Sequence, residues 1–168
     1  MTKNNIINSL RLISICTFIL FTVSGSMVFA DVAKIDSNFD GKMDQWRHTT
    51  ADGKIFKVEH DTNFDGNIDQ VEHFVGDKIL VKAEFDADKN GKMDQIQHYS
   101  DQGKLEKIEK DSKNTGKFDW NEKFDANGKI EQTEIDENGD GKVDIWQYFD
   151  SNQKIKQTNY DTDFNGTT

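Results

Sequence analysis

The chain has 168 residues, with 21 Lys plus Arg, 31 Asp plus Glu, one Cys and no Pro. Residues 1–30 hold two of the basic side chains and the cysteine, so residues 31–168 carry 19 basic and 31 acidic side chains, a net charge of −12. This charge argues against nucleic acid or an anionic membrane surface as a partner. Without cysteine, residues 31–168 allow no disulfide framework, thiol catalysis or Cys-ligated zinc site.

Apolar and aromatic side chains are scarce in residues 31–168. They make up 40 of these 138 residues, about 29%, whereas roughly 45–50% including Gly is usual in globular domains. This composition disfavours a large single core, and by itself it would allow a disordered acidic chain. The internal pattern of the sequence decides against disorder.

Residues 1–30 have the pattern of an export signal. A weakly basic start is followed by an apolar run over residues 12–23 and by small residues that end at Ala30. Such a run fits a signal-peptide core and is too short to span a bilayer, so an uncleaved anchor is the less favoured alternative. Lipidation at Cys16 is disfavoured because a large apolar residue precedes it. We therefore predict a mature chain that begins near Asp31 and is secreted, periplasmic or at the cell surface, with no membrane span after cleavage.

A repeat of 25 residues organises the rest of the chain. A nine-residue acidic segment recurs at this unbroken spacing, starting at Asp36, Asp61, Asp86, Asp111, Asp136 and, in truncated form, Asp161. No linker or change of composition separates the units. Residues 31–168 are therefore predicted to form one repeat domain of five full units and a truncated sixth.

Each unit carries a second turn signal between two short apolar-polar stretches. The signal reads ADGKI at residues 51–55, DQGKL at 101–105 and ANGKI at 126–130, and its Gly and Asn residues favour a hairpin turn. Helices are the competing interpretation, but the turn divides the residues between acidic segments into halves too short for a stable helix. We predict an all-β fold of tandem β-hairpin repeats, solenoid-like or an extended meander, joined by calcium-type loops.

The acidic segment has the spacing of a calcium loop. In the unit that starts at Asp136, oxygen-bearing side chains stand at positions 1, 3, 5 and 9, and position 6 is Gly141. A hard cation such as Ca²⁺ takes about six to eight oxygen ligands, and alternate residues of a tight loop can point inward together. The backbone carbonyl of position 7 can add another oxygen. Magnesium fits poorly, because it demands a small octahedron and retains its waters.

Four units keep every ligand type. Including the position-7 carbonyls, the predicted calcium ligands are Asp36, Asn38, Asp40, Lys42 and Asp44 in the first unit, Asp61, Asn63, Asp65, Asn67 and Asp69 in the second, Asp86, Asp88, Asn90, Lys92 and Asp94 in the third, and Asp136, Asn138, Asp140, Lys142 and Asp144 in the fifth.

Two units depart from this pattern, and so does position 12. The fourth unit has Lys113 and Thr115 at positions 3 and 5, so we predict that it has lost its metal, and the sixth lacks position 9. An EF-hand places a bidentate Glu at position 12, and Glu72 is the one Glu there that serves a complete segment, so we add it to the predicted ligands. Modest calcium affinity follows from this scarcity.

The chain therefore resembles the EF-hand-like family of D-x-D-x-D-G-x-x-D calcium loops that stand between strands in exported repeat proteins. The resemblance covers nearly all of residues 31–168 and implies Ca²⁺ as the cofactor. It implies no particular biological role, and the scarcity of Glu at position 12 argues against a helix-loop-helix that opens as calmodulin does.

Other patterns leave alternatives open. His48, His73 and His98 recur at the 25-residue spacing and would form a zinc-binding column if the units stacked, although a solvated strand face is the preferred interpretation. Aromatic residues on the strands would either fill a thin core or stack against glycans. No nucleophilic or nucleotide-binding motif is present, so we predict no enzymatic activity. The predicted function is calcium binding with a structural or binding role, with a surface protein or glycan as possible partner. The alternative is a glycan-binding or adhesive module at the cell surface.

Overall fold

A computed structural model describes residues 31–167. The predicted export signal at residues 1–30 lies outside the described residues. Between residues 31 and 167 the chain alternates strands with loops and turns, and no helix there is long and apolar enough to cross a membrane.

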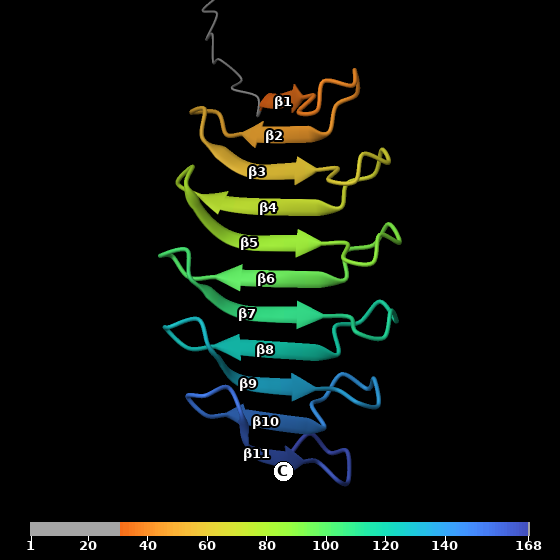
Figure 1. The fold of residues 1–168 in the computed structure, drawn as a ribbon, viewed down its shortest axis with the longest axis vertical. Helices are drawn as coiled ribbons and strands as arrows, with labels where there is room; N and C mark the ends of the chain where they lie inside the picture. Colours follow the sequence, from red (N-terminus) through yellow and green to blue (C-terminus); the bar gives the residue numbers. More distant parts are fainter. Residues whose placement is uncertain (1–30, 168) are drawn as a thin grey trace, which may run out of the picture.

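Eleven strands in the described part of the chain form one open antiparallel sheet, in which each strand pairs with its neighbours in the sequence (Figure 1). This confirms the predicted all-β fold of tandem β-hairpins, which takes the form of an extended meander. The strands are β1 (Asp31–Ile35), β2 (Gln45–Thr49), β3 (Ile55–His60), β4 (Gln70–Val75), β5 (Ile79–Phe85), β6 (Gln95–Tyr99), β7 (Leu105–Lys110), β8 (Trp120–Phe124), β9 (Ile130–Ile135), β10 (Ile145–Phe149) and β11 (Ile155–Tyr160).

The two kinds of connection lie on opposite sides of the sheet, at opposite ends of the strands. The nine-residue acidic segments all lie at one end of the strands and the tight hairpin turns at the other (Figure 1). We number the acidic segments as loops 1 to 5, and a truncated loop 6 starts at Asp161. Loops 1 to 5 span residues 36–44, 61–69, 86–94, 111–119 and 136–144.

Glycine provides the backbone conformation that most hairpin turns require. Gly53, Gly103 and Gly128 have φ angles of 81°, 74° and 75°, in the left-handed region that other residues adopt at a cost. Gln153 takes the same place with a φ of 62°, and its side chain bonds the N–H and the C=O of Ile130 in the preceding hairpin at 2.9 and 3.1 Å. The predicted Gly-containing turns therefore form, and each of the five hairpins also contains a register shift.

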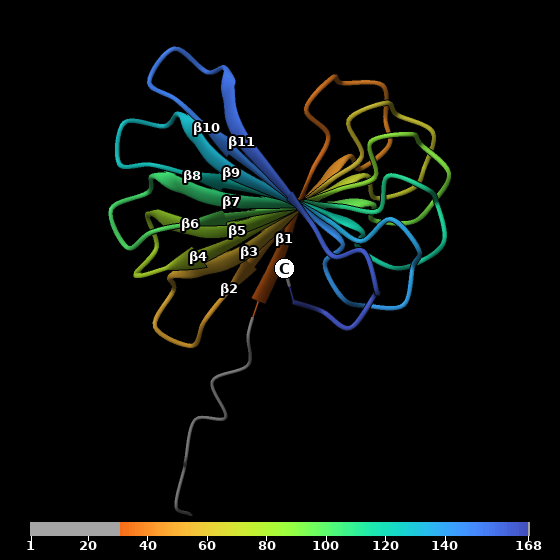
Figure 2. The same cartoon turned by 90° about the horizontal axis from the view of Figure 1, so that it is seen from below.

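The sheet is strongly twisted. Seen along the stack, successive strands fan out around a common axis, with the loops grouped on one side and the turns on the other (Figure 2). Such a twist is the ordinary consequence of L-amino acids in strands. It keeps all the acidic loops on one side of the molecule as the strand direction rotates.

Apolar burial in this sheet is slight. Val58 and Ala83 are the hydrophobic residues that become buried in residues 31–167, with 6% and 1% exposure. They lie on neighbouring odd-numbered strands, and the register places both opposite Glu72. Most other strand residues are half-buried, because a single layer leaves each face to be covered only by its own side chains. The buried residues are mostly aspartates of the loops.

The strand register separates two faces of different character. The histidine face carries a cross-strand row that alternates His48, Lys57, His73, Lys82 and His98. The aromatic face carries a row on the even-numbered strands close to the turns, in which each aromatic residue pairs with an aliphatic one on the next strand. The aromatic members of that row are Phe74, Tyr99, Phe124 and Phe149.

Candidate metal centres

The loops begin and end on a continuation of the sheet ladder. In loop 2, the N–H of Asp69 donates to the C=O of His60 at 2.9 Å. The N–H of Asp86, which opens loop 3, donates to the C=O of Asp69 at 3.0 Å. Equivalent bonds recur at every unit of the described chain, so the first and ninth residues of successive loops stand in one column that links each loop to the next.

The aspartate at position 1 closes each loop on itself. In loop 2, Asp61 accepts the N–H of Asp65 through Oδ1 at 3.1 Å and the N–H of Gly66 through Oδ2 at 2.8 Å. The bond to the position-6 glycine recurs in loops 1 to 5 at 2.6–2.8 Å. Gly66 has a φ of 97°, which permits the sharp bend that brings its N–H to this carboxylate.

The side chains at positions 3 and 5 accept hydrogen bonds from backbone N–H groups of their own loop. Asn63 Oδ1 accepts the N–H of Asp65 at 3.0 Å, and Asp65 Oδ1 accepts the N–H of Asn67 at 2.8 Å. The N–H of Asn67 and the amide of Asn63 hold the pKa of Asp65 below its ordinary value. Position 7 is placed in this way in all four complete loops, with N–H bonds of 2.8–3.0 Å to position 5 at Lys42, Asn67, Lys92 and Lys142.

The aspartate at position 9 is buried at the base of the loop. Asp69 is 3% exposed and accepts the N–H groups of Thr62 and Asn63 at 3.1 and 3.2 Å. Burial works to raise the pKa of Asp69, but the Thr62 hydroxyl and the Lys89 ammonium outweigh it and the pKa is lowered. A carboxylate with this many donors stays charged inside the structure, so it remains a ligand of the kind that Ca²⁺ prefers.

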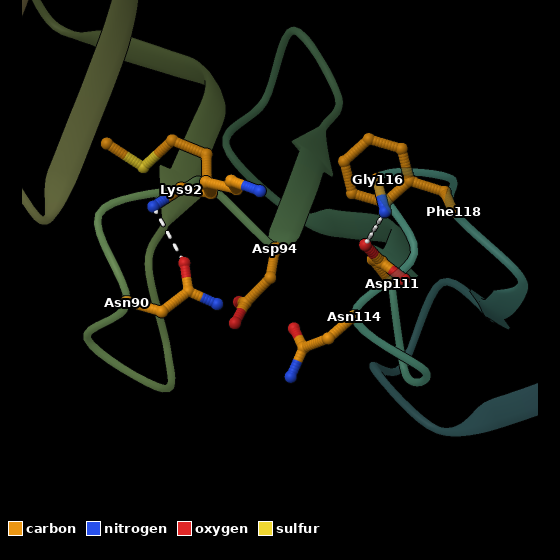
Figure 3. Close-up of a pocket in the computed structure, with 8 residues that line it drawn as sticks. Asn90, Lys92, Asp94, Asp111, Asn114, Gly116 and Phe118 are labelled. Carbon is orange, nitrogen blue, oxygen red and sulfur yellow. Dashed lines mark hydrogen bonds between the residues drawn. The ribbon is translucent and has the colours of Figure 1, made fainter.

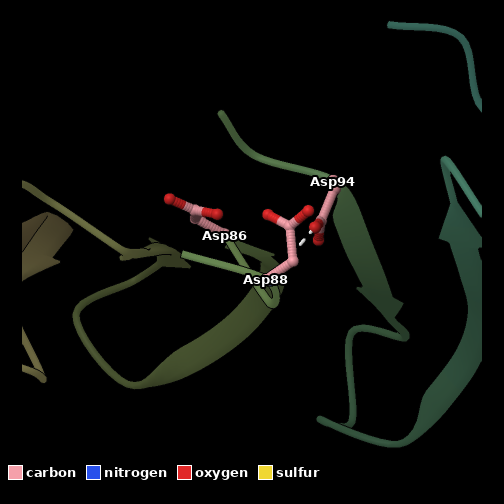
Figure 4. Close-up of side chains that lie close together, drawn as sticks. All are labelled: Asp86, Asp88 and Asp94. Atoms are coloured by element: carbon pink, nitrogen blue, oxygen red, sulfur yellow. Dashed lines mark hydrogen bonds between the residues drawn. The ribbon is translucent and has the colours of Figure 1, made fainter. Parts of the chain in front are cut away.

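Loop 3 brings three carboxylates together. Asp86, Asp88 and Asp94 each offer an oxygen that lies within 4.8 Å of the other two (Figure 4). Asp86 is buried, Asp94 is half-buried and Asp88 is exposed, so this group opens to solvent. Among residues 31–167, this is the one trio of acidic or histidine side chains that meets at that distance. In loops 1, 2 and 5 the third residue is an asparagine, and the aspartates at positions 1, 5 and 9 of these loops do not meet at that distance.

A crevice joins loop 3 to loop 4 (Figure 3). Asp94 and Asp111, from the end of one loop and the start of the next, both line it, and Asn114 donates to Asp88 across it at 2.8 Å. The equivalent crevice between loops 1 and 2 is lined by Asp44 and Asp61, with Phe64 in the place of Asn114. Carboxylates of neighbouring loops thus line the same crevice, so the charge of one loop contributes to the electrostatic potential at the next.

Glu72, which was predicted as a ligand of loop 2, lies in the sheet and not in the loop itself. It stands on β4, where Oε1 accepts a bond from Gln70 at 2.9 Å and Oε2 lies 3.6 Å from His60 Nε2. It belongs to no group of three acidic or histidine side chains within 4.8 Å in the described chain. The EF-hand spacing assumes a helix after the loop, whereas an extended strand carries position 12 away from position 9.

Loops 4 and 6 differ from the complete loops, as the sequence indicates. Lys113 turns its ammonium toward loop 5 and leaves its own loop without a third-position oxygen. Loop 6 keeps the bond between the Gly166 N–H and Asp161 Oδ2. Both loops therefore keep this feature of the others, and loop 4 lacks part of the ligand set.

The histidines of the histidine face contact glutamates within the sheet. Nε2 of His48, His73 and His98 lies 2.6, 2.8 and 2.6 Å from a glutamate on the following strand. In the described residues, none of these histidines belongs to a group of three metal-ligating side chains. The glutamates are Glu59, Glu84 and Glu109, and Lys57, Lys82 and Lys107 pair with the same carboxylates. These partners were not predicted from the sequence, although Lys-x-Glu recurs at the same 25-residue spacing.

Comparisons with known proteins add little. No family model and no curated protein matches the sequence. Structural similarity is found to the accessory secretory protein 1, 2 and 3 structure of Streptococcus pneumoniae, with 14% identity, a TM-score of 0.38 and coverage of 63% of this chain and 19% of that one. TarM of S. aureus, complexed as a mutant with Fondaparinux, alpha-GlcNAc-glycerol and UDP, gives 10% identity, a TM-score of 0.33 and coverage of 74% and 20%.

A further TarM structure gives 11% identity, a TM-score of 0.32 and coverage of 74% of this chain and 20% of that one. This chain thus spans about a fifth of the length of each of these three proteins. Similarity at this level supports no conclusion about function.

Proposed function

We propose that this chain is an exported calcium-binding repeat protein, in which Ca²⁺ orders the loops of the sheet and the protein has a structural or binding role. The observation that carries the proposal is the convergence of Asp86, Asp88 and Asp94 oxygens in loop 3. The other complete loops share its backbone geometry, with Asn in place of Asp88.

Charge supports a divalent cation in these loops. Each complete loop gathers three aspartates within nine residues, and like charges at short range repel. Four divalent ions would reduce the net charge of residues 31–168 from −12 to −4. The ligands are carboxylate and amide oxygens, which suit a hard cation such as Ca²⁺ better than zinc.

Calorimetric titration of the chain with Ca²⁺ tests the proposal. We expect about four bound ions, one for each complete loop, and little competition from Mg²⁺. Asp88→Ala with Asp94→Ala should remove one ion, whereas Asp101→Ala, at a hairpin turn on the opposite edge, should remove none. A stoichiometry of zero or one in the unaltered chain would refute calcium binding as the function.

Export belongs to the same proposal. It is supported by the apolar run in residues 12–23 and the small residues that end at Ala30. A cleaved chain would meet abundant calcium outside the cytoplasm, which suits loops of modest affinity. Amino-terminal sequencing of the protein recovered outside the cytoplasm should give a start near Asp31, and a start at Met1 would contradict cleavage.

The aromatic row favours a second candidate function, binding of a glycan. Phe74, Tyr99, Phe124 and Phe149 recur every second strand on a face that no other element of the described chain covers. Strands are about 4.8 Å apart, so the rings repeat at roughly 9.6 Å. A glycan array that compares the unaltered chain with a Tyr99→Ala, Phe124→Ala variant tests this second function. Binding that the substitutions abolish while calcium stoichiometry stays unchanged supports a glycan module, and absence of binding rejects it.

A further inference from the structure

Loop 4 contains a lysine at a position where its neighbours carry an oxygen. In loops 1, 2, 3 and 5 the third side chain accepts the fifth N–H of the same loop at 2.8–3.1 Å. Lys113 has no acceptor atom, and its Nζ instead donates to the carbonyl oxygens of Asp136 at 3.0 Å and Glu137 at 2.8 Å. These two residues open loop 5, so the side chain spans the junction between loops 4 and 5.

Three oxygens surround the Lys113 ammonium. Besides the two carbonyls, Oδ2 of Asp119 lies 3.5 Å away, and this aspartate is buried with 4% side-chain exposure. An ammonium has three donors and no acceptor, so each donor has one oxygen to face. Lys117, from the same loop, adds a bond to the carbonyl of Gly139 at 2.9 Å. Two lysines of loop 4 therefore bind three backbone carbonyls of loop 5.

Other junctions use acceptors that a metal ion would also use. Lys89 of loop 3 lies 3.0 Å from Asp69 of loop 2, and Asn114 of loop 4 donates to Asp88 of loop 3. Asp69 and Asp88 are both proposed calcium ligands. At the junction of loops 4 and 5, the carbonyls of Asp136 and Glu137 stand at positions 1 and 2, which contribute no carbonyl to the proposed site.

We propose that Lys113 is a built-in cation that joins unit 4 to unit 5 with or without calcium. Its positive charge faces oxygen atoms that would otherwise have no cation beside them in the absence of calcium. It makes no bond to the ligand side chains of loop 5. The inference rests on the proposed function only for the expectation that the other junctions need metal. Without calcium, the junction of loops 4 and 5 therefore opens later than the junction of loops 1 and 2, which no lysine of the described chain bridges.

Hydrogen exchange of the full chain in a calcium chelator, followed by NMR, tests this. The N–H groups of Asp61 and Asp136 make equivalent bonds of 2.9 Å to the preceding loop, whereas the junction at Asp86 already carries the contact between Lys89 and Asp69 and is no reference. We expect the Asp136 N–H to exchange at least about tenfold more slowly than that of Asp61, because charged hydrogen bonds hold its junction closed.

Variants assign the protection to the lysine. Lys113→Met should remove the difference at Asp136 and Lys113→Arg should keep it. Lys78→Met, which removes the same charge at an exposed turn residue, should leave it unchanged. Equal exchange at Asp61 and Asp136 of the unaltered chain, or a Lys113→Met variant that exchanges like the unaltered chain, would overturn the proposal.

A transplanted lysine covers the case in which Lys113→Met does not fold. Asn38→Lys puts the same side chain in loop 1 and should slow exchange at Asp61 in chelator by about tenfold, while it removes one calcium site. Unchanged exchange at Asp61 would reject the proposal. A chain in which added calcium leaves Asp61 and Asp86 unaffected would count against the calcium function, and the comparison made in chelator would still decide the role of Lys113.

Discussion

Aspartates in this molecule occupy places that apolar side chains hold in most folds. Asp44, Asp69 and Asp144 are 5%, 3% and 1% exposed, and each accepts backbone N–H groups from the start of its own loop. Burial of a charge is costly unless donors surround it. These carboxylates therefore shape the loop and also serve as proposed ligands, so their substitution affects folding and metal affinity together.

The ligand set of loop 4 can be restored at two residues. Lys113→Asn with Thr115→Asp gives this loop the same oxygens as its neighbours, so we expect one additional bound Ca²⁺ per chain. Calorimetry measures the stoichiometry. Lys113→Met with Thr115→Val removes the same lysine without adding an oxygen, and serves as the control. An unchanged stoichiometry in the first variant would mean that an oxygen-bearing residue at positions 3 and 5 of the loop is not sufficient to create a calcium site.

The glutamates of the histidine face should make stability depend on acid pH. Burial favours a higher pKa for Glu84, but bonds from Lys82 and His73 outweigh it, so the folded-state pKa lies below the ordinary value of 4.5. The ionised form is thus favoured by folding. The stabilisation is present above the unfolded pKa and is lost as pH falls through the folded one.

Thermal unfolding at fixed calcium, measured from pH 6 down to about pH 3, would show this dependence. Glu84→Gln should flatten the fall in melting temperature on the acid side. Glu106→Gln replaces an exposed glutamate on β7 and should not. Identical acid profiles for the two variants would exclude the ion pairs as a source of stability.

Hairpin turns depend on glycine for backbone reasons alone. Gly103 has a φ of 74°, and a Cβ added there would meet no atom within 4 Å. Gly103→Ala should therefore destabilise the protein by about 1 kcal/mol, from left-handed strain without a clash. The denaturant midpoint in calcium measures it, with Gln102→Ala as control. A loss no larger than that of the control would show that the turn can relax into another conformation.

Local elements of this fold follow from sequence better than contacts between units do. Asp-Gly and Asn-Gly turns and the 25-residue spacing predict hairpins and one loop per unit, because both depend on residues close together in the chain. The reach of Lys113 to residues 23 and 24 positions away depends on the stacking distance and on rotamers, which no local pattern encodes. Glu72 was predicted as a ligand of loop 2 from the spacing of an EF-hand, in which a helix follows the loop. In this protein a strand follows the loop, so that spacing does not apply directly.

Calcium removal should loosen the molecule as a whole. Few apolar side chains are buried, and binding only to the folded form contributes about 2.7 kcal/mol per site at a hundredfold excess over Kd. Circular dichroism should lose β signal with chelator and regain it on addition of calcium. A spectrum and melting temperature that ignore both additions would show that another force holds the sheet.

Units should also depend on one another. Asp65→Ala with Asp69→Ala disrupts a central loop, and because Asp69 carries the backbone link to Asp86, we expect weakened hydrogen-exchange protection in the units on both sides. Asp52→Ala, at the turn edge, is the matched control. Protection lost only within the altered unit would mean that the repeats fold independently.

Every strand touches only its neighbours in the chain, and that makes length a modular property of this molecule. Removal of residues 61–85 would join two equivalent positions and leave each remaining pairing in register. Each unit adds two strands, or roughly 9.6 Å of sheet. Duplication or loss of one unit therefore changes the length of the sheet by a fixed step and requires no new fold.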